Sequence, residues 1–208
     1  MLDQISSYIK ELYKRKPELT RKEFIDKTEL TEFLPVVDDD VARFLRLIMR
    51  IAKPKRILEI GTSIGYSTTS MAQILKEYGG KITTIEYDEK VAEQAKLNFI
   101  NAGVEEYVEL KLGDAREILP SLQERYDLIF QDVDKRLYPS LFNDCLRILK
   151  RDGILIAEDT LFPVLDLDEK WQTLIKPMEQ FNELVVNCPE FDSTLLPIGD
   201  GVIIAVKK

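Results

Sequence analysis

The chain has 208 residues, 45% of them hydrophobic, and a formal net charge of −8 from 29 basic and 37 acidic side chains. This length suits one domain, and the apolar fraction excludes a disordered chain. The acidic balance argues against a broadly basic nucleic-acid surface, although it leaves room for a local basic strip. The chain has no apolar run of the roughly 18 residues that a membrane span needs, and no signal-peptide pattern begins it. We therefore expect a cytoplasmic protein that does not bind membranes.

The chain contains no histidine and only two cysteines, Cys145 and Cys188. Without histidine, Ser-His-Asp and Cys-His catalysis and histidine-ligated zinc are excluded. A general base must be Lys, Asp, Glu or Tyr, and a metal site must be rich in oxygen, which favours Mg²⁺, Ca²⁺ or Mn²⁺. Cys145 lies on the apolar side of a helical pattern, so a buried reduced thiol is favoured over a disulfide or a nucleophile.

Helical patterns occupy the first quarter of the chain. Residues 3–30 are amphipathic, and the basic run before Pro17 ends the first helix. The apolar stripe of that helix consists of Ile5, Tyr8, Ile9 and Leu12. A loop at 35–40 precedes another helix, which ends near Pro54. The apolar positions of this second pattern are Val41, Phe44, Leu45, Ile48 and Ile51.

From residue 56 onward, strand and helix patterns alternate. The predicted strands are 56–60, 82–86, 108–112, 127–132 and 154–158, and the predicted helices are 66–78, 89–101, 115–122, 140–149 and 168–186. This alternation implies parallel strands with helices on both faces. Segments 193–198 and 202–206 flank a Gly-Asp-Gly turn, which indicates a hairpin. The expected fold is α/β, a Rossmann-like doubly wound seven-stranded sheet, mostly parallel, that ends in an antiparallel hairpin strand. N-terminal helices at 1–52 would precede an α/β core at 53–208.

In an open parallel sheet, ligands bind beyond the carboxyl ends of the strands, where the strand order reverses. The first strand ends at Glu59 and Ile60, and Gly61 and Gly65 follow. Two glycines four residues apart permit a tight turn and close approach to a ligand, and the next helix offers free N–H groups to an anion. The stretch matches neither the dinucleotide fingerprint nor the P-loop. A turn that merely joins strand to helix is the alternative.

The next two strands also end in carboxylates. Glu86 ends the second strand, where an acid can accept hydrogen bonds from both ribose hydroxyls. A solvent-facing glutamate is the alternative. The third strand ends before Gly113, Asp114 and Ala115, which could hold an adenine edge. An N-cap role for Asp114 explains the same residue equally well, and both roles are compatible.

The fourth and fifth strands would bring Asp132, Glu158 and Asp159 to one point. Three carboxylates that converge without a cation repel each other, and a hard divalent ion removes that repulsion. Lys135 lies beside them, and a bound cation would lower its pKa and allow it to act as a base. A set of ordinary surface ion pairs is the alternative.

Three motifs occur in a fixed order: Glu-Ile-Gly-Thr-x-x-Gly-Tyr-Ser at 59–67, Gly-Asp-Ala at 113–115 and Asp-x-Asp-Lys-x-x-Tyr at 132–138. As a set they resemble the cation-dependent O-methyltransferases, which include the catechol and caffeoyl-coenzyme A enzymes. The resemblance runs from about Pro35 to the C-terminus. It implies one methyltransferase domain over residues 1–208, S-adenosylmethionine (SAM) as methyl donor, a divalent cation, with Mg²⁺ first and Ca²⁺ or Mn²⁺ as alternatives, and, as in many relatives, a homodimer.

The same resemblance implies roles for individual residues. The cofactor-binding residues would be Val37, through nearby backbone, and Glu59, Gly61, Ser67, Glu86, Asp114, Ala115 and Asp132. Gly61 and Ser67 would contact the methionine end of SAM, and Glu86 the ribose. Asp114 and Ala115 would hold the adenine.

The resemblance also implies a metal site and a catalytic pair. The metal ligands would be Asp132, Glu158 and Asp159, and the catalytic residues would be Lys135, as the base, and Asp132. The family usually has Asp-Asn where this chain has Glu158-Asp159, so one ligand is longer by a carbon and the other carries an added charge. Gln131 also replaces a residue that is usually apolar.

A narrower likeness concerns the acceptor. Segments 3–9, 189–191 and 197–201 are similar to bacterial tRNA 5-hydroxyuridine methyltransferases. This likeness favours 5-hydroxyuridine in tRNA, whose adjacent 5-hydroxyl and 4-carbonyl could chelate a cation as a catechol does. The RNA phosphates would then contact a basic strip made of Lys14, Arg15, Lys16, Arg21 and Lys22. The alternative is that these residues only form a solvated surface. The alternatives are a small catechol or phenolic acceptor, a SAM-binding protein without catalysis, and a nicotinamide-dependent oxidoreductase.

Overall fold

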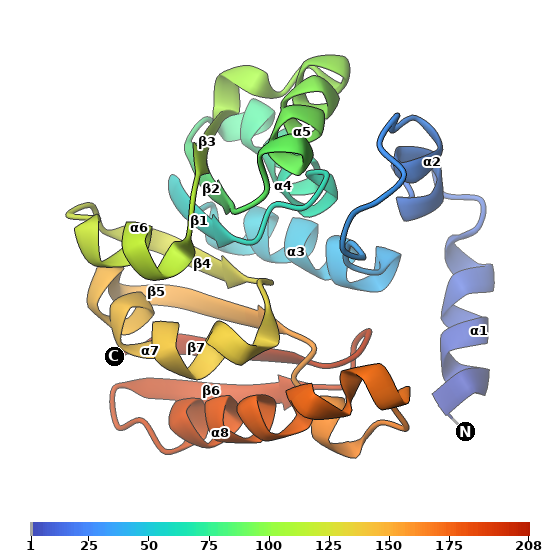
Figure 1. Ribbon diagram of the computed structural model, residues 1–208. Helices are drawn as coiled ribbons and strands as arrows, with labels where there is room; N and C mark the ends of the chain where they lie inside the picture. Colours follow the sequence, from blue (N-terminus) through green and yellow to red (C-terminus); the bar gives the residue numbers. More distant parts are fainter. Residues whose placement is uncertain (1) are drawn as a thin grey trace.

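The computed structural model describes residues 2–208 as a seven-stranded sheet with strand order β3-β2-β1-β4-β5-β7-β6 (Figure 1). The strands are β1 (Arg56–Ile60), β2 (Lys81–Glu86), β3 (Val108–Leu112), β4 (Tyr126–Gln131), β5 (Leu149–Glu158), β6 (Phe191–Leu196) and β7 (Val202–Lys207). Strands β1 to β5 pair in parallel, whereas β7 is antiparallel to both β5 and β6. The predicted fold class is therefore confirmed.

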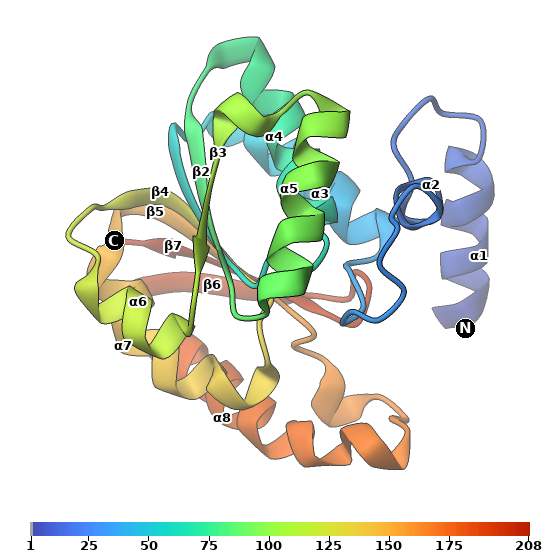
Figure 2. The ribbon, with the colours of Figure 1, turned by 45° about the horizontal axis from the view of Figure 1, so that its top comes forward.

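Helices cover both faces of the sheet (Figures 1 and 2). They are α1 (Leu2–Tyr13), α2 (Arg21–Asp26), α3 (Asp39–Ala52), α4 (Tyr66–Tyr78), α5 (Glu89–Ala102), α6 (Ala115–Ser121), α7 (Tyr138–Ile148) and α8 (Ile175–Val186). One hydrophobic core packs α3, α4 and α5 against the sheet, and a second packs α6, α7 and α8 against the other face. Among residues 2–208, no helix has the length and hydropathy to cross a bilayer.

Strand β1 shows why the central strands are apolar throughout. Ile57 belongs to the core beneath α3, while Leu58 and Ile60 belong to the core beneath α7, and all three side chains are fully buried. Successive side chains of a strand point to opposite faces, so burial on both faces requires a continuous apolar run. Cys145 of α7 lies in the core beneath that helix as a free thiol, as predicted, and burial raises its pKa to about 12.

Two predicted apolar stripes are not buried as expected. Tyr8 and Leu12 of α1 are 66% and 60% exposed, because α1 lies beside the domain rather than on the sheet (Figures 1 and 2). The Ile5 side chain lies outside the described part of the chain. Ile51 of α3 is 71% exposed, whereas Met49 is buried. Periodicity predicted an amphipathic helix in both places, but only tertiary packing selects the face that is covered.

The helix predicted at 168–186 is divided in the structure. A 3₁₀ segment at Glu169–Leu174 precedes α8, and Pro177 lies in the first turn of α8. Proline lacks an amide hydrogen and its ring clashes with the carbonyl four residues earlier, so an α-helix cannot run unbroken through this position. Proline is tolerated in the first turn, which explains where α8 begins.

Candidate active site

The glycine loop after β1 lies directly against the end of β4. Gly61 has φ +99°, and a Cβ added there would lie 2.0 Å from the backbone oxygen of Asp132. Gly65 has φ +87°, and its Cβ would lie 2.4 Å from the ring of Phe99. Both positions require glycine because a side chain is excluded by space and by backbone conformation. The loop therefore closes tightly against the carboxyl end of the sheet.

Glu59 lies beneath this loop and is fully buried. Its carboxylate accepts hydrogen bonds from the hydroxyls of Ser67 at 2.6 Å, of Thr84 at 2.7 Å, and of Thr68. Burial raises the pKa of Glu59 to about 7, although the three hydroxyls act in the opposite direction. Two predicted cofactor residues, Glu59 and Ser67, thus contact each other and join β1 to the start of α4.

Replacement of Glu59 by glutamine should flatten the pH dependence of stability. The pKa of Glu59 rises from 4.5 to about 7 in the folded chain, so the folded state holds its proton more tightly than the unfolded state. Its stabilisation is present below pH ~4.5 and is lost as the pH rises through about 7. At about 1.4 kcal/mol per unit, the wild type should lose about 3 kcal/mol relative to Glu59→Gln between pH 4.5 and 8. Urea unfolding at several pH values measures this difference, and parallel curves would contradict it.

Glu86 is held at the end of β2 by three backbone amides. Its carboxylate accepts hydrogen bonds from the N–H groups of Ser63 at 2.8 Å, Tyr87 at 2.9 Å and Asp88 at 3.0 Å. Tyr87 and Asp88 both donate to Oε1, so only Oε2, which accepts from Ser63, keeps a lone pair for a ligand hydroxyl. The Tyr87 side chain beside it is 76% exposed and was not predicted as a site residue.

Asp114 performs the capping role that was its alternative interpretation. Its carboxylate accepts a hydrogen bond from the Arg116 backbone N–H at 2.8 Å and pairs with the Arg116 guanidinium at 2.5 Å. This guanidinium holds the pKa of Asp114 below its usual value. Ala115, the first residue of α6, is buried. The pair lies at the end of β3, and an adenine role for it stays a prediction.

Val37 is buried in the core beneath α3, so only the backbone around it is available to a ligand. The segment before it crosses the glycine loop. The Ser63 hydroxyl donates to the carbonyl of Leu34 at 2.9 Å, and the Leu30 N–H donates to Gln94 of α5 at 3.1 Å. These contacts hold the segment that precedes Val37 against the glycine loop at Ser63 and against α5.

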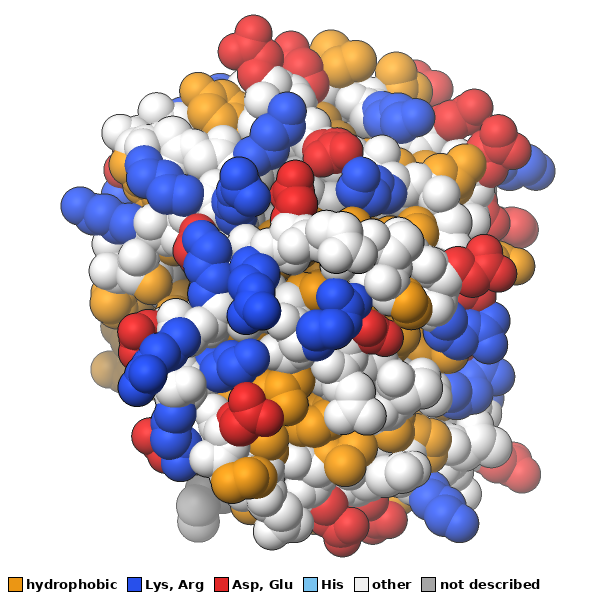
Figure 3. All heavy atoms as spheres, turned by 90° about the vertical axis from the view of Figure 1, so that its left-hand side faces the viewer, with side chains coloured by type: hydrophobic (Ala, Val, Ile, Leu, Met, Phe, Trp, Pro, Cys, Tyr) orange, Lys and Arg blue, Asp and Glu red, His pale blue; other side chains and the backbone are white. Residues whose placement is uncertain are grey.

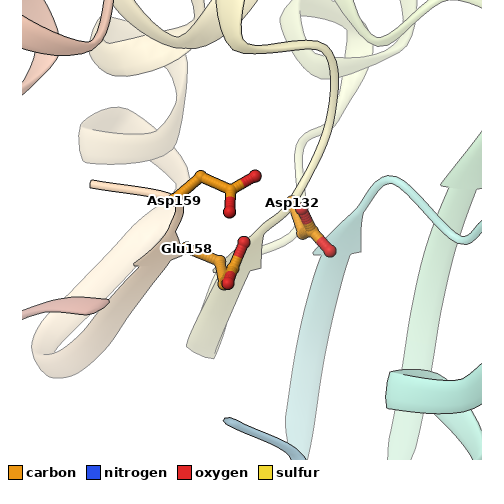
Figure 4. Close-up of side chains that lie close together, drawn as sticks. All are labelled: Asp132, Glu158 and Asp159. Carbon is orange, nitrogen blue, oxygen red and sulfur yellow. The ribbon is translucent and has the colours of Figure 1, made fainter. Parts of the chain in front are cut away.

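Three carboxylates meet at the ends of β4 and β5. One oxygen from each of Asp132, Glu158 and Asp159 lies within 4.8 Å of the others (Figure 4). The Lys135 Nζ lies 2.7 Å from Asp132 Oδ1 and 2.7 Å from Asp159 Oδ2. The convergence predicted from the strand ends is confirmed, and the ammonium group lies between two of the three acids.

The electrostatics of this cluster reflect a shortage of positive charge. Burial raises the pKa of Glu158 well above its usual value, and Asp159 and Asp132 raise it further. Burial also raises the pKa of Asp132. For Lys135, burial alone would lower the pKa, but Asp132 and the neighbouring acids outweigh it and raise the pKa well above the usual value. Lowering of the Lys135 pKa was expected beside a bound cation, and with the carboxylates alone the direction is the opposite.

The donor set fits a hard divalent cation. All three groups offer carboxylate oxygens, the ligands that Mg²⁺, Mn²⁺ and Ca²⁺ prefer. With one lysine and three ionised acids the cluster would carry −2, and burial first, then the neighbouring carboxylates, raise the pKa of Glu158. Added positive charge would offset the effect of the neighbouring carboxylates. A metal role for the cluster nevertheless stays a prediction.

Known proteins match the chain over most of its length. The model of the O-methyltransferase family matches residues 3–208. A catechol O-methyltransferase of Niastella koreensis is 33% identical over 182 residues, which are 83% of this chain and 82% of the relative. A caffeoyl-CoA O-methyltransferase of Populus kitakamiensis is 31% identical over 78% of this chain and 74% of its own. The structure of TomG from Streptomyces achromogenes in complex with SAM, an O-methyltransferase involved in tomaymycin synthesis, superposes with a TM-score of 0.74 at 26% identity, over 83% of this chain and 82% of its own. The chain therefore belongs to the SAM-dependent O-methyltransferases, the family that includes the catechol and caffeoyl-CoA enzymes.

Proposed function

We propose that this enzyme transfers the methyl group of SAM to one hydroxyl of an acceptor that carries two adjacent oxygens, and that a divalent cation assists. The convergence of Asp132, Glu158 and Asp159 beside Lys135 carries this proposal. The cation, when bound, would hold the two adjacent oxygens and lower the pKa of the acceptor hydroxyl and of the Lys135 ammonium.

Lys135 is the residue that we assign to proton removal. Contacts of 2.7 Å to both Asp132 and Asp159 hold its Nζ in one position at the edge of the sheet. The neutral amine takes the hydroxyl proton, and the acceptor oxygen forms its bond to the methyl carbon. The carbon–sulfur bond breaks at the same time, and its electron pair stays on the sulfur of S-adenosylhomocysteine (SAH). The glycine loop aligns donor and acceptor, which supplies much of the acceleration.

The charges near the site favour a small catechol or phenol as the acceptor. Three residues of the predicted basic strip are paired with acids, in Lys14–Glu11, Arg21–Asp38 and Lys22–Asp26. Lys and Arg side chains gather on the face where the parallel strands begin (Figure 3). That face is opposite to the carboxylate cluster, so it supports no path for RNA phosphates to this site.

A second candidate acceptor is 5-hydroxyuridine in tRNA. The turn shared with the tRNA-modifying enzymes, at 197–201, contacts the candidate site, since a Cβ on Gly199 would lie 3.5 Å from Glu158 Oε1. A residue pattern that distinguishes a subgroup and touches the site is expected to bear on the acceptor. This observation favours the tRNA acceptor, whereas the charge distribution opposes it.

Methyl transfer from labelled SAM should distinguish these acceptors and test the cation. With Mg²⁺ we expect methylation of a simple catechol, and removal of the metal with EDTA should lower turnover by about 10²-fold or more. Restoring Mg²⁺ is the control. Turnover unaffected by EDTA would remove the cation from the proposal. Methylation only of tRNA that carries 5-hydroxyuridine would favour the second candidate, and accumulation of that nucleoside in a strain without the protein would support it. SAM binding without any turnover would indicate a non-catalytic protein.

We also propose a homodimer. The apolar side chains that a second copy would cover are Tyr8, Leu12, Leu47 and Ile51, which α1 and α3 leave exposed. Sedimentation at several concentrations measures the mass in solution, and a monomer at all of them would contradict the proposal. The cytoplasmic location likewise stays a prediction.

A further inference from the structure

The hydroxyl of Tyr138 lies at the point where β4 and β5 separate. The last paired residues of these strands are Gln131 and Ala157. Beyond them, the Tyr138 hydroxyl lies 2.9 Å from the carbonyl oxygen of Gln131 and 3.2 Å from that of Glu158. The side chain is fully buried. Its single proton is donated to both carbonyls, so a side chain continues the connection between the two strands.

The two carbonyls belong to residues at the base of the carboxylate cluster. Gln131 directly precedes Asp132, and Glu158 directly precedes Asp159. All three carboxylates therefore extend from backbone that one hydroxyl connects. Loss of the hydroxyl would remove the donor that these two carbonyls share and would free the strand ends to move apart.

The turn at Asp159 explains why such a connection is needed. Asp159 has φ +61°, an uncommon conformation for a residue with a side chain. On one side this turn is held by the Thr160 N–H, which donates to the carbonyl of Gly201 at 3.1 Å. Asn182 of α8 donates to the Thr160 carbonyl at 2.7 Å. The Tyr138 hydroxyl supplies the bond on the β4 side.

The ring of Tyr138 is itself held firmly. It packs edge-on against Phe181 of α8, with ring centroids 5.0 Å apart and planes at 83°. The Lys135 Nζ lies 5.5 Å from the Tyr138 ring centroid, on the side of the carboxylates. The ring thus contacts α8 and the assigned base, while the hydroxyl contacts the strand ends.

We propose that Tyr138 is a positioning residue whose hydroxyl sets the separation between Asp132 and the Glu158–Asp159 pair. It touches none of the reacting atoms and acts through the backbone of the ligands. This inference rests on the proposed cation-assisted function. Residues behind metal ligands typically change metal affinity by 10- to 100-fold when they are replaced.

Manganese binding to the whole protein tests the proposal. In Tyr138→Phe the dissociation constant for Mn²⁺ should rise by about 10- to 100-fold, while the affinity for SAM changes less than about twofold. Tyr126→Phe is the matched control, because Tyr126 is a buried tyrosine at the start of β4, and the Tyr138 hydroxyl contacts the other end of that strand. Phe181→Leu loosens the ring packing but keeps the hydroxyl, so it should lower the melting temperature and leave Mn²⁺ affinity nearly unchanged.

Unchanged Mn²⁺ affinity in Tyr138→Phe would overturn the proposal, and so would an equal loss in Phe181→Leu. If the wild type does not bind Mn²⁺, the cation part of the proposed function fails, and crystal structures of the wild type and Tyr138→Phe then decide the positioning role. Separation of Lys135 from Asp132 or Asp159 in the variant would support it. Retention of both 2.7 Å contacts would overturn it.

Discussion

Replacement of Lys135 by alanine should lower the turnover number by about 10²- to 10⁴-fold, while SAM still binds. The Nζ is the only side-chain nitrogen that the structure, over residues 2–208, places within 2.7 Å of both Asp132 and Asp159. Alanine offers no group to take the acceptor proton. Steady-state kinetics on the methylated acceptor and calorimetry with SAM measure the two effects separately.

The same variant distinguishes two roles of Lys135, a general base and a cation that only holds the neighbouring acids in place. The ammonium group of Lys135 forms ion pairs with two of the three carboxylates. Because its removal frees both acids for a cation, Mn²⁺ affinity should stay unchanged or increase. Arg136→Ala is the matched control, because Arg136 is an exposed cation one residue away that pairs with Asp134. It should retain wild-type turnover. Full activity of Lys135→Ala on the true acceptor would show that Lys135 is not the base.

Replacement of Gly61 by alanine should weaken SAM binding by about 10²-fold or more. The new Cβ would lie 2.0 Å from the backbone oxygen of Asp132, so the loop or the end of β4 must move. The backbone at φ +99° is also unfavourable for alanine. We expect the free energy of unfolding to fall by about 2–4 kcal/mol. Calorimetry with SAM and urea unfolding measure these changes.

Gly79→Ala is the matched control for Gly61→Ala. Gly79 also has a positive φ, +79°, but the nearest atom to its Cβ would be the flexible Lys55 Nζ at 4.0 Å. Only backbone strain remains there, so stability should fall by about 1–3 kcal/mol and SAM affinity should not change. If the two alanine variants bind SAM equally well, the close approach of Gly61 to β4 does not shape the cofactor site.

The order of motifs along the chain was sufficient to predict the family and to exclude one alternative. The alternative prediction of a nicotinamide-dependent oxidoreductase is wrong, because the O-methyltransferase family model matches residues 3–208. The missing middle glycine of the loop at 61–65 had already argued against it. Neither observation identifies the acceptor, because short motifs report the donor site and the edge of the sheet, not the shape of the acceptor pocket.

The roles of several residues could not be read from local pattern. Asp114 pairs with Arg116, Lys14 and Lys22 pair with nearby acids, and the Tyr138 hydroxyl joins two strands. In the sequence, each of these side chains could equally well point into solvent. Only the residues that lie near it in the folded chain determine whether it forms a contact. The motif that contains Tyr138 was visible in the sequence, but the positions of its two acceptor carbonyls were not.

The sequence by itself determined the alternating elements, the glycine turn after the first strand and the acids at the strand ends. These depend on periodicity, on conformations that only glycine adopts easily, and on the rule that parallel strands end at one edge. Only the tertiary structure decided which helix faces are buried and which two acids contact Lys135. Burial and the distances between charges arise from residues far apart in the chain, and a local pattern does not contain them.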